Sequence, residues 1–156
     1  MKVLVDTSVW SLALRRKAPG HAAVDQLRSL VAGGRAALVG VIRQEVLSGV
    51  REKEMFERLR NRLRAFPDEP IVAADYERAA EFFNTCRAKG LQGSNTDFLL
   101  CAVSAGHQLP ILTTDRDFDR YARLLPIVLH PIPIAESGRR QRRNGRRRDD
   151  FAGPTI

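Results

Sequence analysis

The stretch MKVLVDTSVWSLAL, residues 1–14, decides the fold, because a short apolar run leads directly into an acid and then into a helical pattern. Residues 3–5 are wholly apolar, which is typical of a strand buried on both faces of a parallel sheet. Asp6 ends this run, and the residues after it suit a helix with one apolar side. The stretch therefore predicts a buried strand, an acidic turn and a helix.

The same alternation recurs along the chain. The apolar runs at 37–41, 71–73, 111–113 and 127–129 are predicted strands. Because parallel neighbours need crossovers instead of tight turns, we predict an α/β fold with three layers, α/β/α, around a short central parallel sheet. Apolar stripes at helical spacing supply the crossovers: Val24, Leu27, Leu30 and Val31; Phe56, Leu59, Leu63 and Phe66; Tyr76, Ala80 and Phe83.

The composition is that of one globular domain, with 44% hydrophobic and 28% charged residues in 156. The two cysteines, Cys86 and Cys101, lie in apolar helical patterns and are predicted to be reduced core residues, which argues against a disulfide scaffold. The apolar run at the amino terminus is too short for a signal peptide or a membrane span. We therefore expect a cytoplasmic protein.

Two acids follow predicted strands directly. Asp6 follows the run 3–5, and Asp115 follows the run 111–113. In open parallel sheets, ligands bind at the carboxyl ends of the strands, so both acids are candidate ligands. Each also has a purely structural interpretation, as a helix cap or a turn residue, and position alone leaves the two open.

Two further acids are candidates with strong structural alternatives. Asp97 stands three residues after Ser94, the spacing of a capping box, and a first helical turn also favours its ionised form. Glu45 alone would be read as a surface charge, but the residues around it are apolar. Four converging carboxylates would repel one another unless a hard divalent cation such as Mg²⁺ or Mn²⁺ neutralised them, and such ions support phosphodiester hydrolysis.

Four motifs in this order resemble the PIN domain: VDTSVW (5–10), QEVLSG (44–49), SNTDFLLCAVSAG (94–106) and LTTDRDFDR (112–120). More narrowly, they resemble the VapC toxins of bacterial toxin-antitoxin pairs, over about residues 1–135. The resemblance implies a metal-dependent endoribonuclease, a hydrolase that cuts RNA to leave a 5′-phosphate. It also implies a homodimer inhibited by a cognate VapB-like antitoxin.

By position, the resemblance implies that an acidic quartet is catalytic and holds Mg²⁺ or Mn²⁺, with Asp117 as an auxiliary. It further implies that three hydroxyl side chains orient ligands or water, namely Thr7, Ser8 and Thr113. No separate organic cofactor is expected. The quartet consists of Asp6, Glu45, Asp97 and Asp115.

Other interpretations of the acids compete with this one. A haloacid-dehalogenase-like phosphatase would carry a second Asp where this chain has Ser8, and a receiver domain would need an acid pair after its first strand. A non-catalytic RNA-binding module with a basic tail is the main alternative, but the presence of all four acids favours catalysis.

The histidines His21, His107 and His130 lack the spacing of a zinc site and are expected to be surface or hydrogen-bonded residues. Trp10 is expected in the core and not against RNA.

The charge is concentrated at the carboxyl end. The whole chain carries +8, and residues 138–150 contain seven arginines and two aspartates, which gives +5 for that segment. We expect a nuclease domain over 1–136 and a disordered tail over 137–156. One hypothesis is that the tail binds RNA phosphates without sequence preference, and the alternative is a solvated tail with no specific contact.

Overall fold

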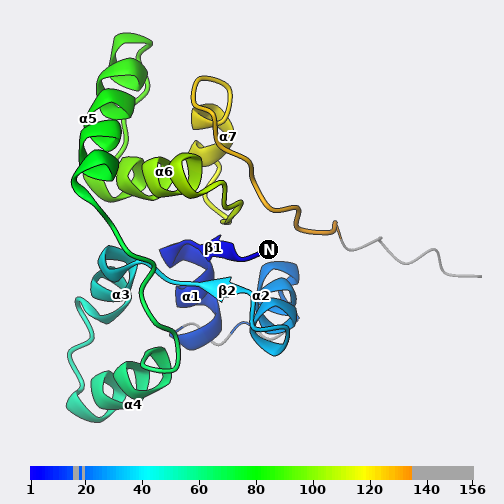
Figure 1. Ribbon diagram of the computed structural model, residues 1–156. Helices are drawn as coiled ribbons and strands as arrows, with labels where there is room; N and C mark the ends of the chain where they lie inside the picture. Colours follow the sequence, from blue (N-terminus) through cyan, green and yellow to red (C-terminus); the bar gives the residue numbers. More distant parts are fainter. Residues whose placement is uncertain (16–17, 19, 135–156) are drawn as a thin grey trace, which may run out of the picture.

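The computed structural model describes residues 1–15, 18 and 20–134, and it places a short parallel sheet between two groups of helices (Figure 1). The strands are β1 (Val3–Val5), β2 (Ala36–Ala37) and β3 (Ile111–Leu112), in the order β2-β1-β3. The central strand β1 is completely buried, because helices cover both faces of the sheet. The predicted α/β fold with a short central parallel sheet is confirmed.

Seven helices occur in the described chain. Figure 1 shows α1 to α4 on one side of the sheet and α5 to α7 on the other, so the sheet is the middle of three layers. The expected domain boundary at Glu136 and the tail 137–156 lie outside the described residues. The helices are α1 (Thr7–Leu14), α2 (Ala22–Ala32), α3 (Gly40–Leu47), α4 (Lys53–Leu63), α5 (Ala73–Ala88), α6 (Asn95–His107) and α7 (Asp117–Tyr121).

Three predicted strands differ from the structure. The run 37–41 was predicted as one strand, but β2 ends at Ala37 and α3 begins at Gly40, because an apolar run alone does not separate a buried strand from a buried helix start. The run 71–73 forms no strand, and the only parallel bridge in that region of the described chain joins Asp68 to Leu38. The run 127–129 contributes a single bridge from Leu129 to Ile111. Prolines lie close to both the run 71–73 and the run 127–129. Because proline lacks the N–H donor of a strand ladder, it limits strand pairing at these two edges of the sheet.

The predicted helix faces are confirmed in part. In α2, Val24, Leu27 and Leu30 are buried, whereas Val31 is 41% exposed. In α4, Leu59 and Leu63 are buried, while Phe66 lies beyond the helix and packs edge-on against Trp10 with ring centroids 5.0 Å apart. Trp10 is therefore a core residue, as expected.

The predicted face of α5 is confirmed only at Phe83, which packs against the core, and is wrong at Tyr76 and Ala80. Tyr76 is 55% exposed, and the buried residues of this helix are Asp75, Ala79 and Cys86. The buried position next to Tyr76 is thus an acid, which an apolar pattern cannot identify as core. Both cysteines are free and buried, as expected.

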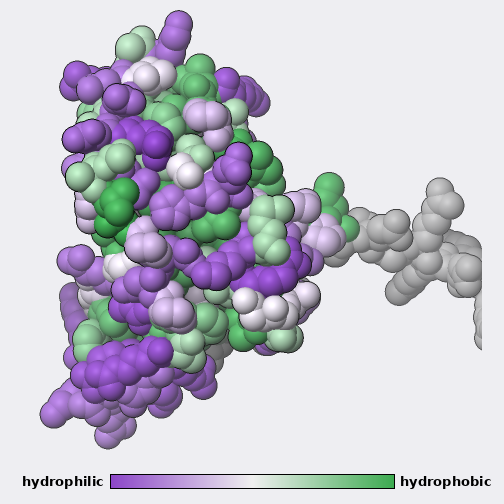
Figure 2. All heavy atoms as spheres, in the orientation of Figure 1, coloured by the Kyte–Doolittle hydropathy of each residue, from purple (hydrophilic) through white to green (hydrophobic). Residues whose placement is uncertain are grey.

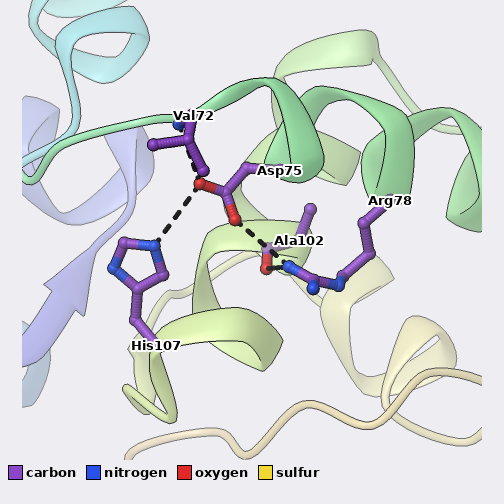
Figure 3. Close-up of polar contacts among 5 residues, drawn as sticks. All are labelled: Val72, Asp75, Arg78, Ala102 and His107. Atoms are coloured by element: carbon purple, nitrogen blue, oxygen red, sulfur yellow. Dashed lines mark hydrogen bonds and ion pairs between the residues drawn. The ribbon is translucent and has the colours of Figure 1, made fainter.

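Asp75 is buried because three donors surround its carboxylate (Figure 3). The backbone N–H of Val72 and Arg78 Nη1 donate to it at 3.0 and 3.1 Å, and His107 Nε2 lies 3.4 Å away. Since His107 ends α6, the cluster fastens the start of α5 to the end of α6. A buried charge of this kind is tolerated only when it is paired.

Arg43 fastens α3 to the end of α4. Its guanidinium donates to the carbonyl oxygens of Leu63 at 2.9 Å and Phe66 at 2.6 Å, and to the carboxylate of Asp68.

The surface over α4 is strongly hydrophilic (Figure 2), and residues 51–64 hold six basic and three acidic side chains, a net charge of +3. None of the helices in the described residues is long and apolar enough to span a membrane.

Candidate active site

Asp6 lies at the carboxyl end of the central strand and is 94% buried by neighbours that bind its carboxylate, with only 6% of the residue exposed. Ser8 Oγ donates to Asp6 Oδ2 at 2.7 Å, and Thr113 Oγ1 donates to the same oxygen at 2.9 Å. The backbone N–H of Ser8 also lies 3.3 Å from it, which makes Asp6 the N-cap of α1. The cap and ligand interpretations are thus compatible, because the second carboxylate oxygen has no hydrogen bond within the described chain.

Glu45 lies half-buried in α3 and is held by a residue from α1. Thr7 Oγ1 donates to Glu45 Oε2 at 2.5 Å, across 38 positions of sequence. Since Thr7 follows Asp6 directly, this bond links the α3 acid to the end of β1. The apolar neighbours Ile42 and Val46 are buried, so the helix is anchored with Glu45 near the cluster and not free in solvent.

Asp97 occupies the first turn of α6 and forms the predicted capping box with Ser94. Asp97 N donates to Ser94 Oγ at 3.1 Å, and Ser94 N donates to Asp97 Oδ2 at 3.0 Å. Burial raises the pKa of Asp97, the hydrogen bonds from Ser94 oppose that effect, and the negative charges of Asp6 and Asp115 raise it further. The repulsion indicates that these three carboxylates share one electrostatic environment.

Asp115 is the exposed member of the four. It follows β3, its backbone N–H donates to Thr113 Oγ1 at 3.0 Å, and its Oδ1 accepts from the backbone N–H of Asp117 at 2.9 Å. Asp117 itself pairs with Arg120 at 3.6 Å on the surface of α7. This exposed ion pair supplies a structural role for Asp117.

Hydroxyl groups link two of the four candidate acids, Asp6 and Asp115, at the carboxyl ends of β1 and β3. Thr113 contacts both Asp6 and the backbone at Asp115, and Ser8 Oγ lies 3.3 Å from Thr113 Oγ1. Within the described residues, none of the four acids forms an ion pair. In the described part of the chain, the four acids are therefore not neutralised by ion pairs, although Arg116 lines the same cavity as Asp115.

The donor set fits a hard divalent cation in its chemistry, since carboxylate and hydroxyl oxygens are the ligands that Mg²⁺ and Mn²⁺ prefer. Its grouping is looser than a finished metal site. No three His, Cys, Asp or Glu side chains of the described chain are arranged as the ligands of a single ion. The fit therefore lies in the oxygen donors and in carboxylates that form no ion pair within the described residues.

Sequence reasoning missed the residues that shape the start of α6. Tyr121 donates from its hydroxyl to the carbonyl oxygen of Gln92 at 3.0 Å, and a Cβ at Gly93 would collide with Tyr121 and with Phe98. The close packing of two aromatic rings on this turn explains why glycine stands there. A helical pattern gives no signal for it, because Tyr121 approaches from α7.

The three histidines form hydrogen bonds with residues other than the four acids, although His21 and His130 line a cavity together with Asp115. His21 caps α2 by accepting from the backbone N–H of Ala23 at 3.2 Å, and His130 Nε2 lies 3.3 Å from Gln26 Oε1. Burial and the charge of Arg35 lower the pKa of His130. Together with His107 in the Asp75 cluster, these contacts agree with the expected hydrogen-bonded roles.

Fold and site together define an α/β domain with an acidic site at the carboxyl ends of its parallel strands. Comparison with known families narrows the class: the PIN domain matches residues 3–124, and the chain belongs to the PIN-domain family. Among curated proteins, it is similar to ribonuclease VapC11 of Mycobacterium tuberculosis and to VapC ribonuclease Mb1587 of Mycobacterium bovis. Each is 30% identical over 126 residues, which covers 78% of this chain and 92% of the relative. The resemblance to VapC-type proteins is thereby confirmed.

Two solved structures share the fold. FitAcB from Neisseria gonorrhoeae matches with a TM-score of 0.66 at 21% identity, over 82% of this chain and 96% of that one. VapBC2 from Rickettsia felis, which was solved bound to a promoter DNA fragment, matches with a TM-score of 0.68 at 18% identity, over 83% and 98%. At these identities the matches establish the arrangement of the layers.

Proposed function

We propose that this chain is an endoribonuclease that hydrolyses RNA phosphodiester bonds with the help of Mg²⁺ or Mn²⁺, and that it acts as the toxin of a toxin-antitoxin pair. The observation that carries the proposal is the cluster of acids at the carboxyl ends of β1 and β3, which lacks a cation partner in the described chain. Membership in the PIN-domain family and the VapC ribonuclease relatives support the same function.

The catalytic residues of the proposal are the four acids named from the sequence: Asp6, Glu45, Asp97 and Asp115. Asp6 would hold the cation with the carboxylate oxygen that Ser8 and Thr113 leave free. Asp97 would offer its remaining oxygen in the same way, since its Oδ2 is engaged by Ser94. When bound, the cation would supply positive charge for the attacking water and for the phosphodiester.

The protein's own residues fix the acids in place before the substrate arrives. Thr7 orients the Glu45 carboxylate, and Thr113 orients Asp6 while it holds the backbone at Asp115. In hydrolysis that leaves a 5′-phosphate, water forms a bond to phosphorus and the bond from phosphorus to O3′ breaks, so O3′ leaves and takes a proton. Preorganised acids reduce the reorganisation that this step requires.

The partners in the proposal are RNA, a cognate antitoxin and a second copy of the chain, and the location is the cytoplasm. FitAcB and VapBC2 support an antitoxin partner by analogy. For the second copy, α5 offers an exposed apolar side chain in Tyr76, beside a cavity of about 400 Å³ that Val41, Phe83 and Leu99 also line. Light scattering of the purified chain tests this: a monomer at all concentrations would remove the homodimer from the proposal.

The function is tested by incubating total cellular RNA with purified protein in Mg²⁺, Mn²⁺ or EDTA, and by sequencing the fragments with their end groups. The matched variants are Asp97→Asn, within the proposed site, and Glu81→Gln on the exposed surface of α5. We expect discrete fragments with 5′-phosphates from the wild type and from Glu81→Gln, and none with EDTA or with Asp97→Asn.

Two results would contradict the proposal. Equal cleavage in EDTA would show that the reaction needs no metal ion. Equal cleavage by Asp97→Asn would show that the assigned site is not the active site. RNA binding without cleavage, after refolding from denaturant has released any bound inhibitor, would favour the non-catalytic RNA-binding alternative.

A further inference from the structure

A basic pocket lies between the end of α5 and α7, on the side of the sheet that also carries α6 (Figure 1). Its volume is about 340 Å³, and no acid of the described chain lines it. Three cations and two leucines surround this open space. The lining residues are Lys89, Leu91, Arg120, Arg123 and Leu124.

Two tight turns bring the cations of the basic pocket together. Gly90 has a φ of +78°, a value that favours glycine, and it reverses the chain directly after Lys89 so that Leu91 packs against the core. Beyond α7, the backbone N–H of Arg123 donates to the carbonyl oxygen of Arg120 at 3.2 Å, so a single turn carries both arginines. Since their backbones are fixed, the three cations lose less freedom when they bind a common ligand.

The cations of the basic pocket are little compensated within the described residues. Lys89 and Arg123 form no ion pair there, and Arg120 lies 3.6 Å from Asp117 in an exposed pair, which is weak in water. Asp119 is also exposed on α7, but it does not line the pocket. The pocket therefore favours an anionic ligand.

A second cavity connects the basic pocket with the start of α6. This cavity has a volume of about 210 Å³, shares Leu91 with the basic pocket, and is also lined by Arg87 and Gly93. Gly93 directly precedes Ser94, whose side chain caps the helical turn that carries Asp97. Arg87 adds a fourth cation along this path, which runs from α7 to the first turn of α6.

Tyr121 holds α7 close to the proposed active site. Its hydroxyl donates to the carbonyl oxygen of Gln92 at 3.0 Å, in the turn before α6. Burial raises the pKa of Tyr121, and the negative charges of Asp97, Asp117 and Asp115 raise it further. Two acids of the proposed site thus act on a residue of the helix that also carries the arginine side of the pocket.

We propose that the basic pocket binds a phosphate group of the RNA strand away from the bond that is cut, and so directs the strand past the start of α6 to the acidic site. The cations contact phosphate oxygens, and the two leucines offer apolar contact to a sugar or a base. Such contacts add affinity and position the strand without reading its sequence. The inference rests on the proposed function in taking RNA as the substrate, and it adds the surface that positions this RNA.

Binding is tested with fluorescently labelled polyuridylate in EDTA, where the proposed function predicts no cleavage. The test variant of the full chain carries Lys89→Gln, Arg120→Gln and Arg123→Gln. The matched control loses three exposed positive charges on α4 and carries Lys53→Gln, Arg58→Gln and Arg62→Gln. We expect the test variant to bind roughly tenfold more weakly at low salt, with a salt dependence of log affinity that is lower by about two in slope, and the control to lose less than about threefold.

A third variant keeps the charge of the basic pocket, with Lys89→Arg, Arg120→Lys and Arg123→Lys, and should bind polyuridylate as the wild type does. All the changed side chains are exposed, so every variant should keep the melting temperature of the wild type. Equal losses in the test and control variants would overturn the inference, because general surface charge would then explain the binding. If polyglutamate binding depended on the three cations and polyuridylate binding did not, the pocket would be assigned to an acidic peptide and the inference would be wrong.

Cleavage kinetics separate this inference from the proposed function. With an RNA that the wild type cuts in Mn²⁺, we expect the test variant to raise KM about tenfold and to leave kcat within about twofold, because the pocket contacts RNA away from the reacting atoms. An unchanged KM would retain the nuclease and reject the RNA-binding role of the pocket. No cleavage by any chain, combined with weaker polyuridylate binding by the test variant alone, would contradict the proposed nuclease and support the pocket.

Discussion

Thr113 Oγ1 donates a 2.9 Å hydrogen bond to Asp6 Oδ2, although 107 positions of sequence separate the two residues. The bond exists because β1 and β3 are parallel neighbours, with Val5 opposite Leu112, so the residues that follow the two strands meet at the same edge. It joins the most buried acid of the cluster to the segment that carries Asp115. This contact is the clearest point at which the sheet assembles the proposed site.

Changing Thr113 to valine tests the contribution of that contact. Valine keeps the shape but removes the donor to a buried carboxylate, so we expect the free energy of unfolding to fall by about 1.5–3 kcal/mol. RNA cleavage should fall as well, because Asp6 loses one of its two side-chain donors. Urea denaturation and a cleavage assay measure the two effects. Thr113→Ser keeps the hydroxyl and should recover most of both, and a serine variant as impaired as valine would contradict the explanation.

Asp97→Asn should separate stability from activity. The Asn side-chain oxygen can still accept from Ser94 N, which preserves the capping box, and one uncompensated charge is removed. We expect a folded protein with a melting temperature equal to or above that of the metal-free wild type, and cleavage lower by about 100-fold or more. A marked loss of melting temperature would show that Asp97 acts chiefly through the cap.

The raised pKa of Asp97 predicts a pH effect with a definite sign. The folded state holds the proton of Asp97 more tightly than the unfolded chain, in which the pKa of this carboxyl is 3.8. The free energy of unfolding therefore falls as pH rises from below 3.8 through the folded pKa, and it stays at its lower level above that. Measured against Asp97→Asn across this range in EDTA, the wild type should lose stability relative to the variant as pH rises. The opposite slope would contradict the shift.

Divalent binding should show the matching proton competition. A cation requires the ionised carboxylate, so Mn²⁺ affinity should stay level near neutral pH and fall as pH is lowered into the range where Asp97 takes up its proton. Calorimetric titration at several pH values measures the affinity, and the same titration in buffers of different ionisation heat counts the protons released. Affinity that rose on acidification would be inconsistent with carboxylate ligands.

Gly93→Ala should disturb the turn that introduces α6. The added methyl group would meet Tyr121 and Phe98, with the Phe98 ring atom only 2.9 Å away, so the rings must shift. We expect a loss of about 1–3 kcal/mol in the free energy of unfolding, as for other overpacked sites, and a drop in cleavage through displacement of Asp97. Gly33→Ala is the control, since its nearest atom is Ser29 O at an ordinary 3.4 Å. Equal effects of the two changes would refute the packing argument.

Local pattern determined much of this protein. Three features could be predicted from the sequence: the buried strand at 3–5, the acids Asp6 and Asp115 that follow apolar runs, and the capping box of Ser94 and Asp97. Strand burial, strand ends and helix caps depend on residues close in sequence, which is why these predictions were possible. The family resemblance rested on the same short motifs. The strand ends also predicted which acids should lie at one edge of the sheet.

Only the tertiary structure decided the rest, because those features depend on residues far apart along the chain. The face of α5 was misread because Asp75 is buried by Arg78 and by His107 from α6, and a charged residue reads as exposed until its partners are known. No sequence pattern predicted the need for glycine at position 93, because the side chain that leaves no room for a Cβ there, Tyr121, comes from α7. The hydroxyls of Thr7 and Thr113 reach Glu45 and Asp6 only when the helices and strands have packed, so the sequence determined which groups exist and the packing determined which of them meet.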